Sequence, residues 1–235
     1  MQVTINDQLL DIPFDLSEIT LSKYVGYYDK YGRELDKQLV DLLEKKYEGD
    51  DDEIEISKQI DLDNHIDNEA LSWVSYFSGF DLFEVRTEKY IQPLLSQYRV
   101  LRFVIKESLE SALEFPQVIE WNGDQWFIQD FKINPSSEMS FNEIITSKEV
   151  IRQIHRLSKG KWDAMQYLCA IFFRKKDEAF SDALVDNDSE RMKVLNDLPM
   201  TYVLKVAFFL SSCVNTWSNT LAYSPEKEVE KVNQN

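Results

Sequence analysis

The chain has 235 residues, of which 42 are acidic and 26 are Lys or Arg, so its net charge is -16 and its isoelectric point is about 4.6. This acidity argues against nucleic acid as the main ligand, because such binding depends on Lys and Arg that neutralise phosphates. A hydrophobic content of 43%, with only six Gly and six Pro, indicates a globular protein and argues against a disordered chain or an all-β fold.

The N-terminal 49 residues predict a β-hairpin followed by two helices. Apolar residues alternate on both sides of Asn6-Asp7, a pattern typical of two strands joined by a tight turn. Thr20 is the expected N-cap of a helix that carries three tyrosines on one face and breaks near Gly32. A second, leucine-rich helix is expected from about Glu34 to about Gly49.

The segment from Asp41 to Glu69 is strongly acidic, with 12 acidic and 3 basic residues. A flexible acidic loop is expected near residues 49–56. The loop does not fit a calcium site, because Glu55 occupies the position that requires Gly. A solvated acidic surface is therefore expected, and its four candidate contact residues are Asp50, Asp51, Asp52 and Glu53.

Two helices and a second hairpin are expected between residues 66 and 131. One helix ends at Gly79, and a longer one begins around Thr87, with Pro93 in its first turns, where a missing amide costs least. Trp121-Asn122-Gly123-Asp124 predicts a type I′ turn, since Asn and Gly accept positive φ. Aromatic residues lie on both faces of this hairpin, so a helix or a partner is expected to cover at least one face. Aromatic residues anchor interfaces as well as cores, and the candidate contact residues here are Trp121, Trp126 and Phe127.

The C-terminal part predicts a series of helices. Ser140-Phe141-Asn142-Glu143 is a capping box, and isoleucines including Ile145 and Ile151 are expected to form the core face of the helix that follows, which ends at Gly160. Further helices are expected over residues 162–173, 189–195 and 199–223, the first of them closed by the basic run Arg174-Lys175-Lys176.

The segment from Lys148 to Lys176 is basic, with 8 basic and 2 acidic residues. Three interpretations of its basic row stay open: a solvated face, contact with the acidic segment within or between copies, and contact with phosphate. The row consists of Arg152, Arg156, Lys159 and Lys161.

These elements predict an α+β fold that is predominantly helical, a helical bundle with two short β-hairpins. The hairpins either join in one small four-stranded sheet or belong to two separate units. In the second case residues 1–114 and 115–224 form the units, each a hairpin followed by helices. A single compact domain is the alternative, and residues 225–235 are expected to be a mobile tail.

No motif in the sequence indicates catalysis or a cofactor. No glycine-rich loop precedes a helix, which argues against a Walker or dinucleotide-binding motif. His65 and His155 are far apart, and Cys169 and Cys213 form no CxxC pair, so no metal site is expected. Cys169 lies in an apolar helical stretch and is expected to be a buried, reduced thiol. No signal peptide is expected, and the uncharged run Val206–Pro225 is too polar for a membrane span.

Two stretches carry a resemblance to a group of known proteins. The first is Ile12-Pro13-Phe14-Asp15-Leu16-Ser17-Glu18-Ile19-Thr20-Leu21, followed by Tyr24. The second runs from Met139-Ser140-Phe141-Asn142-Glu143 through Trp162, Ala170-Ile171, Arg174, Glu190-Arg191 and Leu198-Pro199 to Phe208-Phe209-Leu210. Together they resemble small virion or morphogenesis proteins of tailed bacteriophages, including those of the crAss-like group.

The resemblance implies a non-enzymatic role: cargo of the head or tail, a ring or adaptor component, or a tail-assembly chaperone. It implies other phage structural proteins and further copies of this chain as partners. No small-molecule substrate and no cofactor are implied, and nucleic acid is at most a peripheral ligand. The implied location is the virion and, during assembly, the host cytoplasm. The resemblance does not extend to the segment from Asp41 to Glu114.

Overall fold

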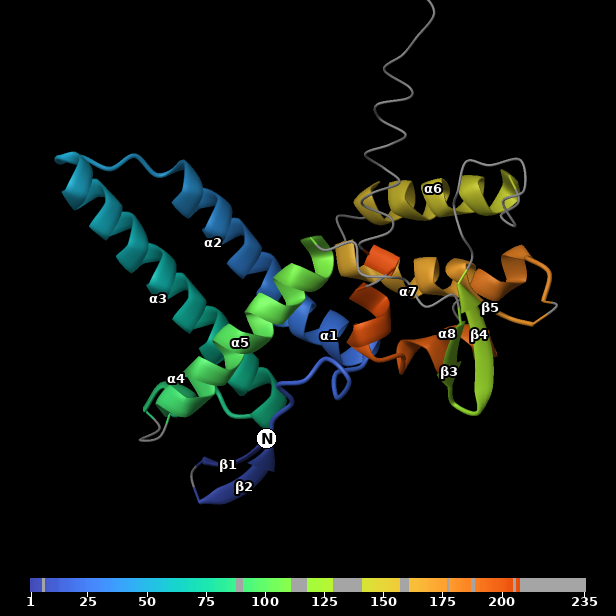
Figure 1. The fold of residues 1–235 in the computed structure, drawn as a ribbon, viewed down its shortest axis with the longest axis horizontal. Coiled ribbons are helices and arrows are strands. Elements are labelled where there is room, and N and C mark those ends of the chain that lie inside the picture. Colours follow the sequence, from blue (N-terminus) through green and yellow to red (C-terminus); the bar gives the residue numbers. More distant parts are fainter. Residues whose placement is uncertain are drawn as a thin grey trace, which may run out of the picture.

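The computed structural model describes residues 1–207, apart from residues 6, 88–90, 111–117, 129–140, 157–160, 177, 187–188 and 205. It confirms a predominantly helical α+β fold. An arm formed by α2 (Arg33–Glu44) and α3 (Asp51–Ser78) projects at one end of the molecule, as Figure 1 shows. The other end holds α6 (Phe141–Arg156), α7 (Lys161–Phe172) and a small sheet.

The expected N-terminal hairpin is confirmed. Its strands β1 (Gln2–Ile5) and β2 (Gln8–Asp11) pair antiparallel. Asp7 has a φ of 61°, a left-handed conformation that Asp tolerates in tight turns. The hairpin forms a two-stranded sheet of its own, so the alternative of one sheet shared by both hairpins is wrong.

The predicted helix break near Gly32 is wrong. α1 (Leu21–Tyr27) begins at the expected cap, where Thr20 Oγ1 accepts a hydrogen bond from the amide of Lys23. A π-helical turn, η1 (Tyr28–Gly32), then leads directly into α2. Gly32 has a right-handed helical backbone, and a Cβ atom there would overlap the Tyr28 ring. This glycine therefore makes room for a packed tyrosine within a continuous helical segment.

The acidic run at residues 50–53 is part of a helix, so the flexible loop predicted there is wrong. Asp50 is the N-cap of α3, and its carboxylate accepts a hydrogen bond of 2.9 Å from the amide of Glu53. Asp51, Asp52 and Glu53 form the first turn, where negative charge interacts favourably with the helix dipole. α3 has 28 residues and ends at the predicted Gly79, whose φ is 80°.

The long helix expected from about Thr87 is α5 (Ile91–Glu110), and a short helix that was not predicted, α4 (Leu82–Thr87), precedes it. α5 crosses α3 where the arm joins the body (Figure 1). Arg99 Nη2 lies 2.8 Å from Asp67 Oδ1, and Arg102 Nε lies 2.7 Å from Glu69 Oε2. These ion pairs add to the packing of α3 against α5.

The second hairpin is confirmed, with β3 (Val118–Trp121) and β4 (Asp124–Ile128) on either side of the predicted turn. Asn122 and Gly123 have φ values of 54° and 79°, as a type I′ turn requires. A third strand, β5 (Phe173–Lys175), pairs antiparallel with β4. The helix predicted to end with the basic run therefore stops at Phe172, and the chain continues as a strand.

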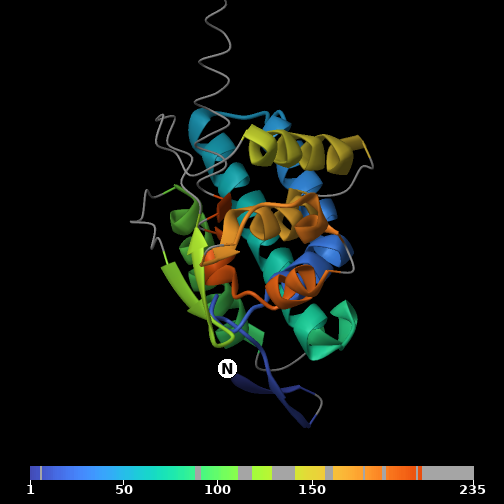
Figure 2. The same ribbon diagram turned by 90° about the vertical axis from the view of Figure 1, so that its right-hand side faces the viewer.

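Two of the isoleucines predicted for the core face of α6 are exposed, which corrects the prediction for these residues. Glu143 and Ser147 are buried, whereas Ile145 and Ile151 are 47% and 41% exposed. An ion pair between Glu143 and Arg174 of β5 turns this side of the helix inward. α7 lies between α6 and α8 (Glu190–Asn196), as Figures 1 and 2 show. A 3-10 turn, η2 (Asp182–Val185), precedes α8, and Ser189 caps α8 as predicted.

One continuous cluster of buried residues extends from the N-terminal segment to residue 206. Thr20 forms a β-bridge with Pro199. The Leu21 amide donates to the Leu198 carbonyl (2.9 Å), and the Met200 amide donates to the Ile19 carbonyl (2.8 Å). The last described helix begins after Pro199 as predicted. Segments from residues 1–114 and 115–224 thus share a core.

Several predicted features lie outside the described residues. They are the cap at Ser140, the helix end at Gly160, the thiol of Cys213, the last helix beyond residue 207 and the tail over residues 225–235.

Candidate interaction surfaces

The first candidate surface is one side of the arm. Residues 52 and 53 precede residue 56 by four and three positions, and residue 60 follows it by four, so all four lie on one side of α3. Ile56 and Ile60 are 60% and 55% exposed, and both acidic residues are exposed. We call this set the α3 face: Asp52, Glu53, Ile56 and Ile60. Two exposed isoleucines beside two carboxylates form a surface that fits an apolar partner with basic neighbours.

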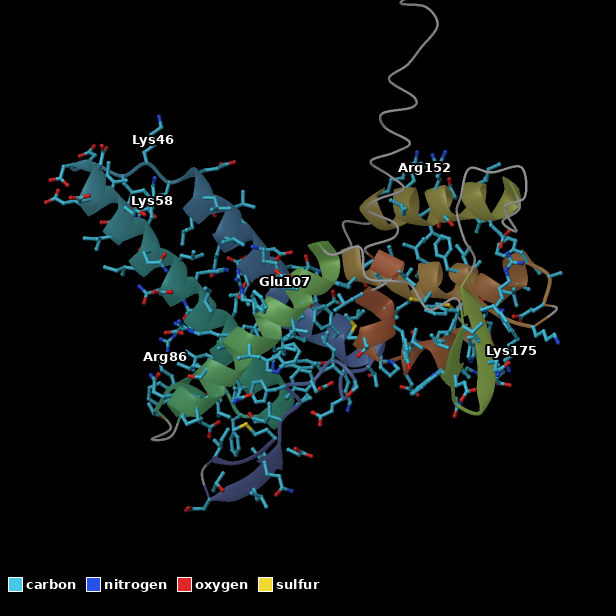
Figure 3. The ribbon with its side chains drawn as sticks, viewed as in Figure 1. Lys46, Lys58, Arg86, Glu107, Arg152 and Lys175 are labelled. Carbon is cyan, nitrogen blue, oxygen red and sulfur yellow. The ribbon has the colours of Figure 1, made fainter. Side chains whose placement is uncertain are left out.

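The loop between α2 and α3 is fixed to the adjacent side of the arm. Lys45 Nζ lies 2.5 Å from Asp61 Oδ2, and the Tyr47 hydroxyl donates to the same oxygen over 2.8 Å. The hydrogen bond from Lys45, followed by that from Tyr47, lowers the pKa of Asp61. The ammonium group of Lys58 lies 5.8 Å from the centre of the Tyr47 ring. These contacts support a helix whose first turns project away from the body, where Figure 3 shows Lys46 and Lys58.

The second candidate surface is the outer side of α6. Its residues are three or four positions apart, and Figure 3 shows Arg152 pointing away from α7. Arg152 forms two hydrogen bonds of 2.8 and 2.7 Å with Glu149, and these lower the pKa of the Glu149 carboxyl. We call this set the α6 face: Ile145, Lys148, Arg152 and Arg156. All four residues are exposed, and Ile151 lies beside them.

The inner side of α6 explains why Ile145 and Ile151 point outward. Glu143 is fully buried and pairs with Arg174, of which the side chain is 10% exposed. The Ser147 hydroxyl donates to the Glu143 carbonyl over 2.7 Å. Beside this pair, Arg191 Nη1 lies 2.6 Å from Glu178 Oε1. A buried charge requires a partner, so the pair of Glu143 with Arg174 places the Glu143 side of α6 against the body.

The structure places the other predicted contact residues in different surroundings. Trp126 is buried, and its indole nitrogen donates to the Trp121 carbonyl over 3.1 Å. Lys175 and Arg191 lie over the Trp126 ring, 5.3 and 5.4 Å from its centre. Trp121 and Phe127 are partly buried. Lys161 is the first residue of α7, and Lys159 lies outside the described residues.

A third exposed apolar surface lies on α5 and was not predicted. Val100, Phe103 and Val104 are exposed, and they share one helix face at spacings of three and four. The sequence did contain a signal, because five of the six residues from 100 to 105 are apolar. The buried face of an amphipathic helix holds fewer than five of six consecutive residues. Some of these apolar residues must therefore face outward or meet a partner.

The two side chains that most resemble catalytic groups, those of His65 and Cys169, are buried. His65 is buried, and its Nε2 atom lies 3.1 Å from Glu69, which also binds Arg102. Cys169 is fully buried. In the part of the chain that the structure describes, no three His, Cys, Asp or Glu side chains are grouped so as to hold a metal ion. Among the same residues, no helix has the length and hydrophobicity needed to cross a bilayer.

The Cys169 thiol is expected to be unreactive in the folded protein. Burial raises the pKa of this thiol, and reaction with a disulfide reagent requires an accessible thiolate. In a Cys213→Ser variant, DTNB at pH 8 is expected to label the native protein at least about 100-fold more slowly than the protein unfolded in guanidinium chloride. Fast labelling of the native variant would show that the thiol is accessible and able to act as a nucleophile.

Compared with known proteins, the chain matches no family model, no curated protein and no solved structure.

Proposed function

We propose that this chain is a non-enzymatic protein of a tailed bacteriophage that works by binding other proteins, as cargo or as a ring or head-tail component of the particle. The observation that carries the proposal is the pair of exposed, oppositely charged faces, one on α3 and one on α6. Each combines charge with exposed isoleucine, as surfaces that bind proteins do.

The placement of the residues that carry the phage resemblance supports this proposal. The stretch from Ile12 to Tyr24 packs against parts of the second stretch. The Tyr24 ring meets the Trp162 ring edge-on at 4.7 Å, and the backbones join at Thr20 and Pro199. The resemblance does not extend to residues 41–114, which form most of the arm and also α4 and α5. Among the described residues, the two stretches that carry the resemblance therefore pack together, and the arm projects beside them.

A tail-assembly chaperone that is absent from the mature particle is the second candidate. The apolar surface of Val100, Phe103 and Val104 on α5 favours it, because a chaperone covers hydrophobic segments of an unassembled partner with such a surface.

Mass spectrometry of gradient-purified particles from a phage that encodes this chain tests the proposal. A particle component is expected to be present in a fixed ratio to the capsid protein. Its absence from particles, combined with its recovery on a tail protein from infected cells, would favour the chaperone. Recovery with neither, or saturable turnover of a small molecule that one substitution abolishes, would overturn the proposal.

A further inference from the structure

We infer that copies of this chain bind one another head to tail, with the α3 face of one copy on the α6 face of the next. The inference deepens the proposed function and rests on it: it names a second copy as one partner and assigns the contacting residues. The two faces differ from each other. When the α3 face of one copy binds the α6 face of another, the pair therefore still has one free α3 face and one free α6 face.

The shape of the molecule excludes a contact between the two faces within one copy. The free end of the arm and α6 lie at opposite ends of the longest axis, with the body between them (Figure 1). α3 packs against α5, and ion pairs of Arg99 with Asp67 and of Arg102 with Glu69 lie across this contact. The two faces can therefore meet only between molecules. Contacts of this heterologous kind produce closed rings or open filaments, depending on the rotation between neighbours.

The chemistry of the two faces is complementary. Asp52 and Glu53 on the α3 face supply carboxylates, and Arg152 and Arg156 on the α6 face supply guanidinium groups. Two packed helices approach to about 8–10 Å, a distance at which isoleucines from both can interdigitate. Burial of these side chains then supplies affinity, and the charged residues at the rim select the partner and the orientation.

The same features favour a protein over nucleic acid as the occupant of the α6 face. Ile145 and Ile151 are exposed beside the cations, and a phosphate backbone gives such side chains nothing to bury against. A second copy offers both the carboxylates and the isoleucines that this face requires.

Sedimentation velocity of the full chain at low and high salt tests the inference. The wild type is expected to assemble with rising concentration at about 50 mM salt and to dissociate at about 500 mM, because rim charges are screened. Arg152→Glu with Arg156→Glu, and separately Asp52→Lys with Glu53→Lys, are each expected to weaken assembly at least about tenfold. An equimolar mixture of the two variants is expected to assemble again, since each reversed face then meets a complementary one.

Matched controls separate this contact from general effects of charge and folding. Lys23→Glu with Lys30→Glu changes the net charge as the arginine variant does, at two exposed residues on a different part of the molecule, and is expected to assemble like the wild type. Ile56→Ser with Ile60→Ser is expected to weaken assembly at both salt concentrations. Circular dichroism is expected to show wild-type helix content for every variant.

Three outcomes would overturn the inference. They are a wild type that stays monomeric at low salt, a mixture of the two charge variants that does not assemble, and an arginine variant that assembles normally but loses binding to a labelled DNA oligonucleotide. Each leaves the proposed function intact if the chain is found in purified particles. Conversely, assembly of the purified chain combined with its absence from purified particles would support the contact and count against the particle role.

Discussion

Replacing Trp73 with alanine is expected to lower the free energy of unfolding by about 3–5 kcal/mol. The Trp73 side chain is fully buried where α3 meets α1 and α5. Its ring lies 4.8 Å from the Tyr27 ring and 5.7 Å from the Tyr98 ring, measured between centres. Its indole nitrogen also donates a hydrogen bond of 2.9 Å to the Pro13 carbonyl. The alanine variant loses these contacts and leaves the partly buried Pro13 carbonyl without this donor.

Urea denaturation followed by circular dichroism measures this effect. Trp73→Phe removes the donor but keeps part of the packing, so it is expected to cost less than the alanine variant. Phe83→Ala is the matched control, because this aromatic side chain is largely exposed and its loss is expected to change stability by less than about 0.5 kcal/mol. Equal effects of Trp73→Ala and Phe83→Ala would show that Trp73 is not the centre of the core.

Replacing Glu143 with alanine is expected to destabilise the protein by about 3–5 kcal/mol, because Arg174 is then a buried charge without its main counter-charge. The double variant Glu143→Leu with Arg174→Met is expected to be more stable than the single variant. It removes both charges and fills the space with apolar atoms, a replacement that is often neutral.

Thermal unfolding of the single and double variants measures this coupling. Glu149→Ala is the control on the same helix: it breaks the exposed ion pair with Arg152, and exposed pairs contribute little. A double variant that is less stable than Glu143→Ala would contradict the assigned role of the ion pair.

The fold could be predicted from the sequence where the signal is local. The turn at Asn122-Gly123 and the left-handed Gly79 need backbone conformations that few residues adopt, so those residue types mark the elements directly. The cap at Thr20 belongs to the same class. Each depends on neighbours within a few positions and is independent of the rest of the fold.

The incorrect predictions concern choices that distant residues determine. The three residues of β5 continue an apolar helix in sequence, and they become a strand because they pair with β4, about 50 residues earlier. The isoleucines of α6 suggested a core face, but the arginine that pairs with Glu143 comes from β5. At residues 50–53, charge density suggested a loop, although acidic residues also stabilise the first turn of a helix.

The candidate surfaces were only partly predictable for the same reason. Their charges are visible in the sequence, so the acidic residues of the α3 face and the arginines of the α6 face were predicted as contact residues. Their isoleucines were not, because exposure depends on what the rest of the chain covers. Ile145 is outside because Glu143 and Ser147 are inside.

The bridge between Thr20 and Pro199 has a consequence for biosynthesis. The two segments that the bridge joins are about 180 residues apart in sequence. The N-terminal segment therefore leaves the ribosome long before its partner is translated. Until then the Leu21 amide lacks the Leu198 carbonyl and the Tyr24 ring lacks Trp162, so the nascent chain exposes this part of the segment to chaperones and proteases. A truncated product that ends before residue 198 cannot form the bridge between Thr20 and Pro199.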